Sequence, residues 1–410
     1  MSFFKDLSFS SATAGFVAVL VGYTSSVAIV FQAAQAFGAT PDIIASWMWA
    51  LGIGMGVCTL VPSLWLKKPV MVAWSTPGAA VLASAGLAGA SNPGGGFTMA
   101  QAVGAFMACA VLITVAGATG WFERVMNRIP VAIASALLAG VLARLGLTGF
   151  SAAQTALPLV LTMLLAYLVG RRFSPRFAVP ATLVVAILFV AAGAGFTGAT
   201  VTFDITKPVF VAPEFTLAAF VTLALPLFIV TMASQNLPGV ATITACGFGD
   251  RRAEGGDAGI PVSKIITLTG VASFVLAPFG GYALNLAAIT AAICMGPEVH
   301  PEPRRRYTAA VVCGAIYIVI GCFGAAVTGV LTAFPKELVA AIAGLALLGT
   351  IGSALQAAMQ DDEQREAALI TFLVTLSGVV IAGVGSAFWG VVAGALALLV
   401  QHYRPRSAGA

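Results

Sequence analysis

Charged residues are scarce in this chain. Only 9% of its 410 residues are Asp, Glu, Lys or Arg, whereas 60% are hydrophobic. Soluble domains carry about 25% charged residues, so the composition excludes an ordinary soluble protein and indicates a polytopic membrane protein. A signal-peptide pattern is also missing, because the first apolar run, residues 11–37, is too long for an h-region and no cleavage signal ends it cleanly.

Residues suited to catalysis or metal binding are equally scarce. The two histidines, His300 and His402, lie outside the expected membrane core, and no pair among the six cysteines has metal-ligand spacing. An intramembrane enzyme would need a nucleophile with a base, or metal ligands, inside its spans. We therefore expect no enzyme, no metal and no cofactor, and we expect no nucleic-acid partner. A G-x-x-x-x-G-K-[ST] motif is absent too, so transport driven by ATP would need a partner chain.

Long apolar runs are what the chain has in quantity. A helix that spans a bilayer needs about 20 apolar residues, and the sequence divides into about 14 such segments: residues 11–37, 43–64, 70–88, 99–119, 130–146, 154–170, 179–198, 215–247, 260–279, 281–296, 307–331, 337–358, 367–383 and 385–402. With the N-terminus in the cytoplasm and the spans alternating, 17 of the 20 Lys and Arg fall on the cytoplasmic side. The positive-inside rule requires this asymmetry, so we predict that both termini are cytoplasmic.

Two of these spans are interrupted. In the third, an extended-looking run over residues 69–74 leads through Ser75-Thr76-Pro77-Gly78 into a small-residue helix, for which Thr76 is the expected N-cap and Pro77 suits the first turn. In the tenth, a glycine-rich entry leads to Asn285 and a second small-residue helix. Broken spans are tolerated only where they line a cavity or are buried in protein. They are also the best pointer to a transporter's binding site.

The spacing of polar residues predicts an internal repeat. Ser75 follows Ser26 by 49 residues and Asn285 follows Asn236 by 49, so the two halves are offset by 210 at both places. Seven spans per half would make the second half enter the membrane from the opposite side. The predicted fold is therefore an all-α polytopic membrane protein of about 14 transmembrane segments. It is a seven-plus-seven inverted repeat with spans 3 and 10 broken into a short strand plus a half-helix.

Three stretches of the chain resemble the benzoate membrane transport family: WSTPGAA at 74–80, ASQNLPG at 233–239 and NLAAIT at 285–290. That family is similar in fold to the uracil permease and sulfate-permease transporters. The resemblance implies a core domain from residues 1–120 and 201–332 and a gate domain from residues 121–200 and 333–410. It implies a benzoate/proton symporter of the bacterial inner membrane, which moves benzoate or a related aromatic carboxylate by alternating access. It also suggests monomers or a homodimer formed through the gate domain.

Other functions stay open at this point. A nucleobase or inorganic-anion transporter of the same fold is the alternative, since Trp74 and the amide pair Gln235 and Asn236 would also suit a heterocycle. An ion channel would need a continuous polar pore, whereas the polar clusters here are interrupted and lie at one depth.

A benzoate site needs an apolar slot for the ring and hydrogen-bond donors for the carboxylate. The N-terminus of each half-helix carries roughly +0.5 of an elementary charge, which can hold an anion without a buried Lys or Arg. We predict that backbone N–H groups near Thr76 to Gly78 and near Leu286 to Ala288 bind the carboxylate, and that Trp74 stacks on the ring. The predicted substrate-binding residues are Tyr23, Ser25, Ser26, Trp74, Ser75, Thr76, Pro77, Gly78, Gln235, Asn236, Asn285, Leu286, Ala287 and Thr290.

No residue of this set titrates near neutral pH, which leaves three explanations of proton coupling. The substrate carries the proton as neutral acid, or a carboxylate at the membrane rim such as Glu214 or Glu298 relays it, or the transporter is uncoupled or driven by another ion.

Overall fold

The computed structural model describes residues 3–24, 26–90, 96–120, 131–173, 178–193, 204–249, 259–296, 299–379, 381 and 386–402. The first half contains α1 (Phe3–Asp6), α2 (Phe9–Thr24), α3 (Val27–Ala36), α4 (Pro41–Leu66), β1 (Val72–Trp74), α5 (Thr76–Ala90), α6 (Met99–Ala118), α8 (Val131–Ser151), α9 (Ala153–Phe173) and α10 (Ala178–Ala192). The second half contains α11 (Leu217–Ala219), η2 (Phe220–Ala224), α12 (Leu225–Thr231), η3 (Met232–Asn236), α13 (Leu237–Ala245), α14 (Val262–Leu276), η5 (Ala277–Phe279), β2 (Leu284–Leu286), α15 (Ile289–Met295), η6 (Pro303–Arg305), α16 (Tyr307–Cys322), α17 (Gly324–Ala333), α18 (Lys336–Ala358), α19 (Arg365–Ser377) and α20 (Ser386–His402).

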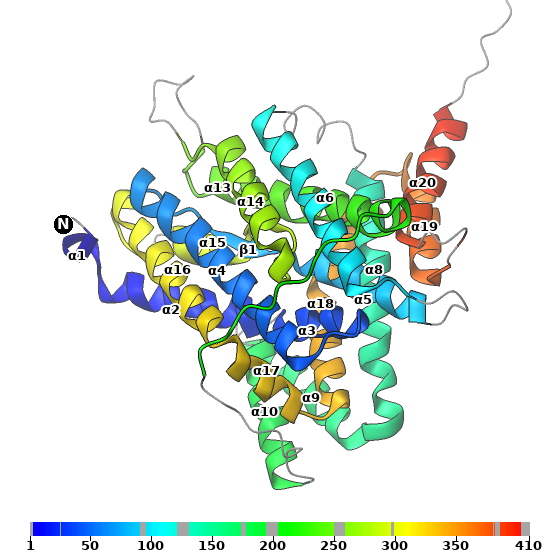
Figure 1. Ribbon diagram of the computed structural model, residues 1–410, viewed down its shortest axis with the longest axis horizontal. Coiled ribbons are helices and arrows are strands. Elements are labelled where there is room, and N and C mark those ends of the chain that lie inside the picture. The colour runs from blue at the N-terminus through cyan, green and yellow to red at the C-terminus, as the bar shows by residue number, and fades with distance from the viewer. Residues whose placement is uncertain are drawn as a thin grey trace, which may run out of the picture.

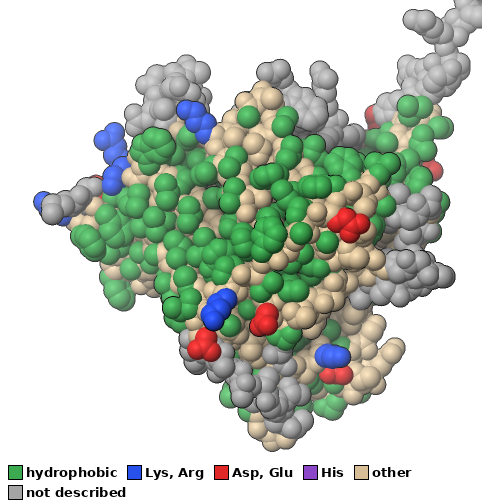
Figure 2. Space-filling model, viewed as in Figure 1, with side chains coloured by type: hydrophobic (Ala, Val, Ile, Leu, Met, Phe, Trp, Pro, Cys, Tyr) green, Lys and Arg blue, Asp and Glu red, His purple; other side chains and the backbone are tan. Residues whose placement is uncertain are grey.

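Most of the expected apolar runs form helices. Among the described residues, nine helices are long and apolar enough to cross a membrane. Their ends carry ordinary stop and start signals: Thr40 and Thr98 cap α4 and α6 through their side chains, and Lys67 ends α4 in the left-handed conformation. Hydrophobic side chains cover much of the face shown in Figure 2, with few charged ones among them. Such a surface fits a chain surrounded by lipid rather than water.

The helices form two groups, which Figure 1 shows side by side. In the first group, α16 packs against α4 and α2, and α14 packs against α6. In the second group, which includes α19 and α20 at the right of Figure 1, α8 packs against α18 and α19. Close packing depends on glycines at the crossing points: a Cβ on Gly52 would lie 2.6 Å from the Cα of Gly321, where α4 crosses α16.

Several expected spans are less regular than their hydropathy indicates. The first divides into α2 and α3, and the eighth contains two π-helical segments, η2 and η3. The eleventh is broken between α16 and α17 at Phe323. The helix after β2 is also short, with seven residues in α15 against fifteen in α5. π-Helical turns are often found at functional sites, and η3 contains Gln235 and Asn236.

An extended segment, residues 204–216, crosses the outside of the first helix group (Figure 1). It is tied down at intervals by its own N–H groups: Thr206 donates to Cys322 O, Val209 to Ser46 Oγ, Val211 to Pro278 O and Glu214 to Ala100 O, at 2.8–2.9 Å. These acceptors belong to four different elements of the group, so the segment joins α4, α6, α16 and η5 from outside.

Candidate binding site

Two short strands lie where the sequence predicts extended entries to helices. β1 and β2 pair in antiparallel fashion, with Val72 opposite Leu286 and Trp74 opposite Leu284. The ladder continues by one bond at each end, from Ser75 N to Ala283 O and from Ala287 N to Met71 O. Because the strands are antiparallel, α5 and α15 begin at opposite ends of a ladder that is only about 10 Å long.

A two-stranded ladder has two open edges, and inside a membrane those edges need hydrogen-bond partners. Side chains of α4 supply them for β1. Thr59 Oγ1 accepts from Val72 N at 3.1 Å, and Ser63 Oγ accepts from Val70 N at 3.0 Å. Each hydroxyl also donates to the carbonyl of the same strand residue. Thr59 and Ser63 are four residues apart, which places them on one face of the helix, and Val70 and Val72 expose their N–H groups to that face.

The edge of β2 is satisfied in the same manner from other helices. Ser273 Oγ of α14 accepts from Leu284 N at 2.9 Å, and Asn236 Oδ1 of η3 accepts from Leu286 N at 2.9 Å. Asn236 was predicted to contact substrate, but its carboxamide is fully buried and its nitrogen donates to Met232 Sδ. Sequence reasoning missed Thr59, Ser63 and Ser273. Their only signal is a hydroxyl on an apolar helix face, which simple helix packing also produces.

The start of α5 is capped by Ser75 rather than by Thr76. Ser75 Oγ accepts from Gly78 N at 3.0 Å, Ser75 O accepts from Ala79 N at 2.8 Å, and the helix begins at Thr76 with Pro77 in its first turn. Thr231 Oγ1, which the sequence did not single out, lies 2.9 Å from Ser75 Oγ. The predicted Gly78 N–H donor is therefore already bonded, and Pro77 has none. Within the described part of the chain, Thr76 N–H has no partner, and its side chain is half-buried.

Trp74, Tyr23 and Ser26 form a buried cluster beside this helix start. Trp74 Nε1 donates to Ser26 Oγ at 2.8 Å, and the rings of Tyr23 and Trp74 are 5.0 Å apart and tilted. Ser26 in turn donates to Gly22 O. Since Trp74 is only 3% exposed, its ring packs against Tyr23 in this conformation. Ser25, the remaining predicted residue of this stretch, lies outside the described residues.

Asn285 and the residues after it connect β2 to α15. The Asn285 side-chain amide is oriented so that both its oxygen and its nitrogen have partners. The oxygen accepts from Ser75 N and the nitrogen donates to Leu286 O, both at 2.9 Å, so Asn285 links the two strands. The N–H groups of Leu286 and Ala287 are bonded to Asn236 and Met71. Ala288 has no side-chain cap, its N–H has no partner among the described residues, and the buried Thr290 Oγ1 has none either. Thr290 packs against Gly22 of α2.

Some residues of the predicted set are half-buried and others are buried. η3 contacts both β2 and α8, and α5 also contacts α8. Within this region Thr76, Ser234, Gln235 and Ala288 are partly exposed, whereas Ser26, Ser75, Asn236 and Asn285 are buried. The structure therefore divides the predicted set. Ser26, Ser75, Asn236 and Asn285 hold the strand–helix elements in place, and Thr76 and Gln235 lie on elements that contact α8.

One charge lies deeper than expected. The sequence placed Arg144 at a span end, but α8 continues to Ser151, seven residues further. The Arg144 guanidinium packs directly on Gly378, which ends α19 in the left-handed conformation. A cation is stabilised there by the partial negative charge of the helix C-terminus.

Among the described residues, no group of three or more His, Cys, Asp or Glu is placed to hold a metal ion. Glu214 is exposed and accepts from Gln101 Nε2 at 3.1 Å. Glu298 lies outside the described residues.

Comparison with known proteins gives consistent results. The family model described as "Benzoate membrane transport protein" matches residues 5–400. The chain is 44% identical over 95% of its length to "Inner membrane protein YdcO" of Escherichia coli, covering 95% of that protein. It is 38% identical over 97% of its length to the "Benzoate membrane transport protein" of Acinetobacter baylyi, covering 96% of it.

Solved structures resemble it in fold alone. The transmembrane domain of a cyanobacterium bicarbonate transporter, BicA, matches with a TM-score of 0.53 and 14% identity, with 96% of each chain covered. The murine anion transporter Slc26a9 in its inward-facing state matches with a TM-score of 0.54 and 14% identity, covering 97% of this chain and 68% of that one.

Proposed function

The chain belongs to the benzoate membrane transport protein family, and on that premise we propose that it is a secondary active transporter of benzoate or a related aromatic carboxylate in the bacterial inner membrane. The family itself consists of membrane transporters, not enzymes. The proposed cycle is alternating access of a core domain, residues 1–120 and 201–332, against a gate domain, residues 121–200 and 333–410. We also propose that the substrate is transported together with protons and that both termini of the chain lie in the cytoplasm.

The observation that carries this proposal is the paired ladder. β1 and β2 come from chain positions more than 200 residues apart and pair next to two helix starts. A transporter of 14 spans built as a seven-plus-seven inverted repeat would place its two broken spans, 3 and 10, side by side in this way. One pair of helix positions also fits the repeat: Ser63 and Ser273 differ by 210, the offset that relates Ser75 to Asn285, although the strand residues they bond, Val70 and Leu284, differ by 214.

The contact pattern supports the same division into repeats. α4 packs on α16 while their counterparts α14 and α6 pack on each other, and α15 packs on α2 while α5 packs on α12. In each of these pairs, a helix of the first half packs against a helix of the second half. Gln32 Nε2 of α3 donates to Val339 O of α18 at 3.3 Å, which places one hydrogen bond across the proposed core–gate boundary. Such a bond would have to break and reform during alternating access.

In the proposed site the substrate lies between the ladder and α8. The carboxylate accepts hydrogen bonds from Thr76 N–H and its hydroxyl, or from Ala288 N–H and Thr290 Oγ1, with Gln235 as a further polar contact. Ser75, Asn236 and Asn285 position these groups by capping α5 and joining the strands. Tyr23, Ser25, Ser26 and Trp74 border the ring-binding region, and Pro77, Gly78, Leu286 and Ala287 form its backbone wall.

Among the described residues, the acidic side chains lie in loops or at the ends of spans, which favours the substrate itself as the proton carrier. Glu214 is exposed on the outer segment 204–216, so of the two rim carboxylates considered it is poorly placed for a relay. Benzoic acid is mostly ionised at neutral pH, and uptake as neutral acid therefore predicts a rate that rises steeply as the external pH falls.

The test is uptake of labelled benzoate into proteoliposomes, with an imposed pH gradient and with the gradient collapsed. Accumulation that needs the gradient, and that benzoate analogues but not uracil or sulfate inhibit, is the expected result. Inhibition by uracil or sulfate instead would favour the alternative function, a nucleobase or inorganic-anion transporter of the same fold. Equal uptake with and without the gradient would reject proton coupling while leaving the substrate intact.

A further inference from the structure

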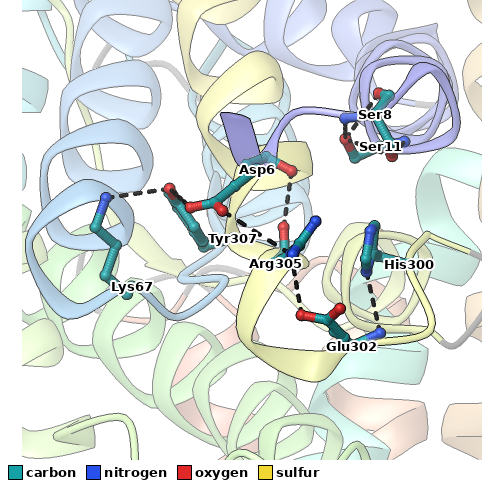
Figure 3. Close-up of polar contacts among 9 residues, drawn as sticks. Asp6, Ser8, Ser11, Lys67, His300, Glu302, Arg305 and Tyr307 are labelled. Atoms are coloured by element: carbon teal, nitrogen blue, oxygen red, sulfur yellow. Dashed lines mark hydrogen bonds and ion pairs between the residues drawn. The ribbon is translucent and has the colours of Figure 1, made fainter. Parts of the chain in front are cut away.

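A polar network outside the proposed site joins four parts of the chain at one end of the first helix group (Figure 3). The Tyr307 hydroxyl, at the start of α16, is the centre of the network. It accepts from Lys67 Nζ at 3.1 Å and donates to Asp6 Oδ2 at 2.8 Å. Arg305 lies 3.9 Å from Asp6 and 2.9 Å from Glu302 through its Nε. Contacts of this kind fix α1 against the end of α4 and the start of α16.

Positive charge exceeds negative charge in this cluster. Counted with their sequence neighbours, the described residues of the network include two acidic ones, Asp6 and Glu302, and six basic ones: Lys5, Lys67, Lys68, Arg304, Arg305 and Arg306. Arg306 is buried, and its guanidinium donates to two backbone carbonyls, Met295 O and His300 O, both at 2.9 Å. Because Met295 is the last residue of α15, Arg306 caps the end of that helix. Lys5, Lys67 and Arg304 are exposed and Lys68 is half-buried. Lys and Arg side chains gather at the same corner, next to α1, in Figure 2.

Large aromatic side chains stand exposed around this cluster. Phe4 is 83% exposed, Phe9 88% and Trp65 85%, and they come from α1, α2 and the last turn of α4. Phe3, by contrast, packs inward against the Tyr307 ring, with centroids 6.4 Å apart. A large aromatic surface exposed to water is unfavourable, whereas aromatic side chains are enriched at the boundary between headgroups and acyl chains. Basic residues at that depth attract anionic headgroups.

We infer that Lys5, Lys67 and Lys68, with Phe4, Phe9 and Trp65 around them, form a binding site for an anionic phospholipid. The lipid's phosphate lies among the ammonium groups, and its acyl chains lie along the exposed aromatics. Because the network joins α1, α4 and the start of α16, a lipid bound there contacts the proposed core domain and not the gate. The site does not depend on the identity of the transported substrate.

The experiment uses Trp65 as a local reporter. The full-length protein is reconstituted in phosphatidylcholine vesicles that contain about 20% of either dibrominated phosphatidylglycerol or dibrominated phosphatidylcholine. Quenching that belongs to Trp65 is obtained as the difference between wild type and Trp65→Phe. We expect at least twofold stronger quenching of Trp65 by the brominated phosphatidylglycerol. We also expect that preference to fall as salt rises from 0.1 M to 1 M, because the Debye length shrinks from about 10 Å to about 3 Å.

Three variants make the test specific. The triple variant Lys5→Gln, Lys67→Gln, Lys68→Gln should lose the phosphatidylglycerol preference, whereas the charge-conserving Lys→Arg triple should keep it. Arg171→Gln with Arg172→Gln removes a basic pair at the end of α9 and should leave Trp65 quenching unchanged.

Equal quenching of the wild type by both brominated lipids would overturn the inference, as would a preference retained by the Gln triple. Loss of the preference on adding millimolar inorganic phosphate would also overturn it, since the ligand would then be free phosphate rather than a lipid.

Discussion

Replacing Thr59 by Val removes one hydroxyl and leaves the shape of the side chain almost unchanged. Thr59 is fully buried in α4, and its Oγ1 is the acceptor for Val72 N at 3.1 Å. The substitution therefore leaves a backbone N–H of β1 without a partner inside the protein. A buried unsatisfied donor costs about 1–3 kcal/mol, and the ladder that positions α5 should weaken by that amount.

Thr269→Val in α14 is the matched control. Thr269 is equally buried, but its hydroxyl only donates to Ile266 O within its own helix. Removing that donor leaves no N–H group without an acceptor, so the expected cost is smaller than that of Thr59→Val. The two variants make the same chemical change at the same burial, and they differ only in whether a strand edge loses its acceptor.

Thermal unfolding of the detergent-solubilised protein measures the difference. One kcal/mol shifts the Tm of a domain of 150–250 residues by about 2–4 °C and that of a longer chain by less. We expect Thr59→Val to melt about 2–5 °C below Thr269→Val and to transport more slowly at equal reconstituted protein. If both variants melt together and transport equally, the hydroxyl does not support the ladder and the reasoning about its edges is wrong.

Three further predictions concern the proposed site directly. Ser75→Ala removes the cap of α5, which is worth about 0.5–2 kcal/mol, and should reduce benzoate uptake; Ser75→Thr keeps the hydroxyl and should retain most of it. Gly239→Ala introduces a Cβ that would lie 2.7 Å from Leu286 Cβ and 3.0 Å from Leu286 O, so overpacking of about 1–3 kcal/mol should lower both Tm and uptake, and unchanged values would refute the close approach. Initial uptake rates measured across external pH at fixed total benzoate should follow the concentration of neutral acid, and a flat profile would count against the substrate as proton carrier.

The sequence predicted the elements of this fold better than their contacts. Apolar runs marked most of the helices, and the interruptions near Ser75 and Asn285 coincided with the two strands. Those features are local, since Pro, Gly and hydropathy act on their own stretch of chain. The edge partners Thr59, Ser63 and Ser273 are set by tertiary packing, and a Ser or Thr in an apolar helix has the same local sequence whether it bonds its own helix or a strand.

The sequence predicted a set of polar residues for the candidate site, but not which of them bond within the protein and which remain unbonded. Ser75 and Thr76 are both good helix caps, so only the backbone geometry decides that Ser75 caps α5 and leaves Thr76 N–H unbonded. The π-helical turn at η3 could not be predicted either, and neither could the bond that Asn236 Oδ1 accepts from Leu286 N across the fold. These are consequences of long-range contacts that no single stretch of sequence contains.

The extended segment 204–216 has a consequence for how this family can vary during evolution. Its N–H groups at residues 206, 209, 211 and 214 reach fixed acceptors on separate parts of the fold. Deleting or inserting one residue in the middle would shift every later bond onto the wrong group, although the segment has no regular secondary structure. Surface loops usually tolerate changes of length, but here insertions and deletions should be absent between residues 206 and 214, even where the side chains themselves diverge.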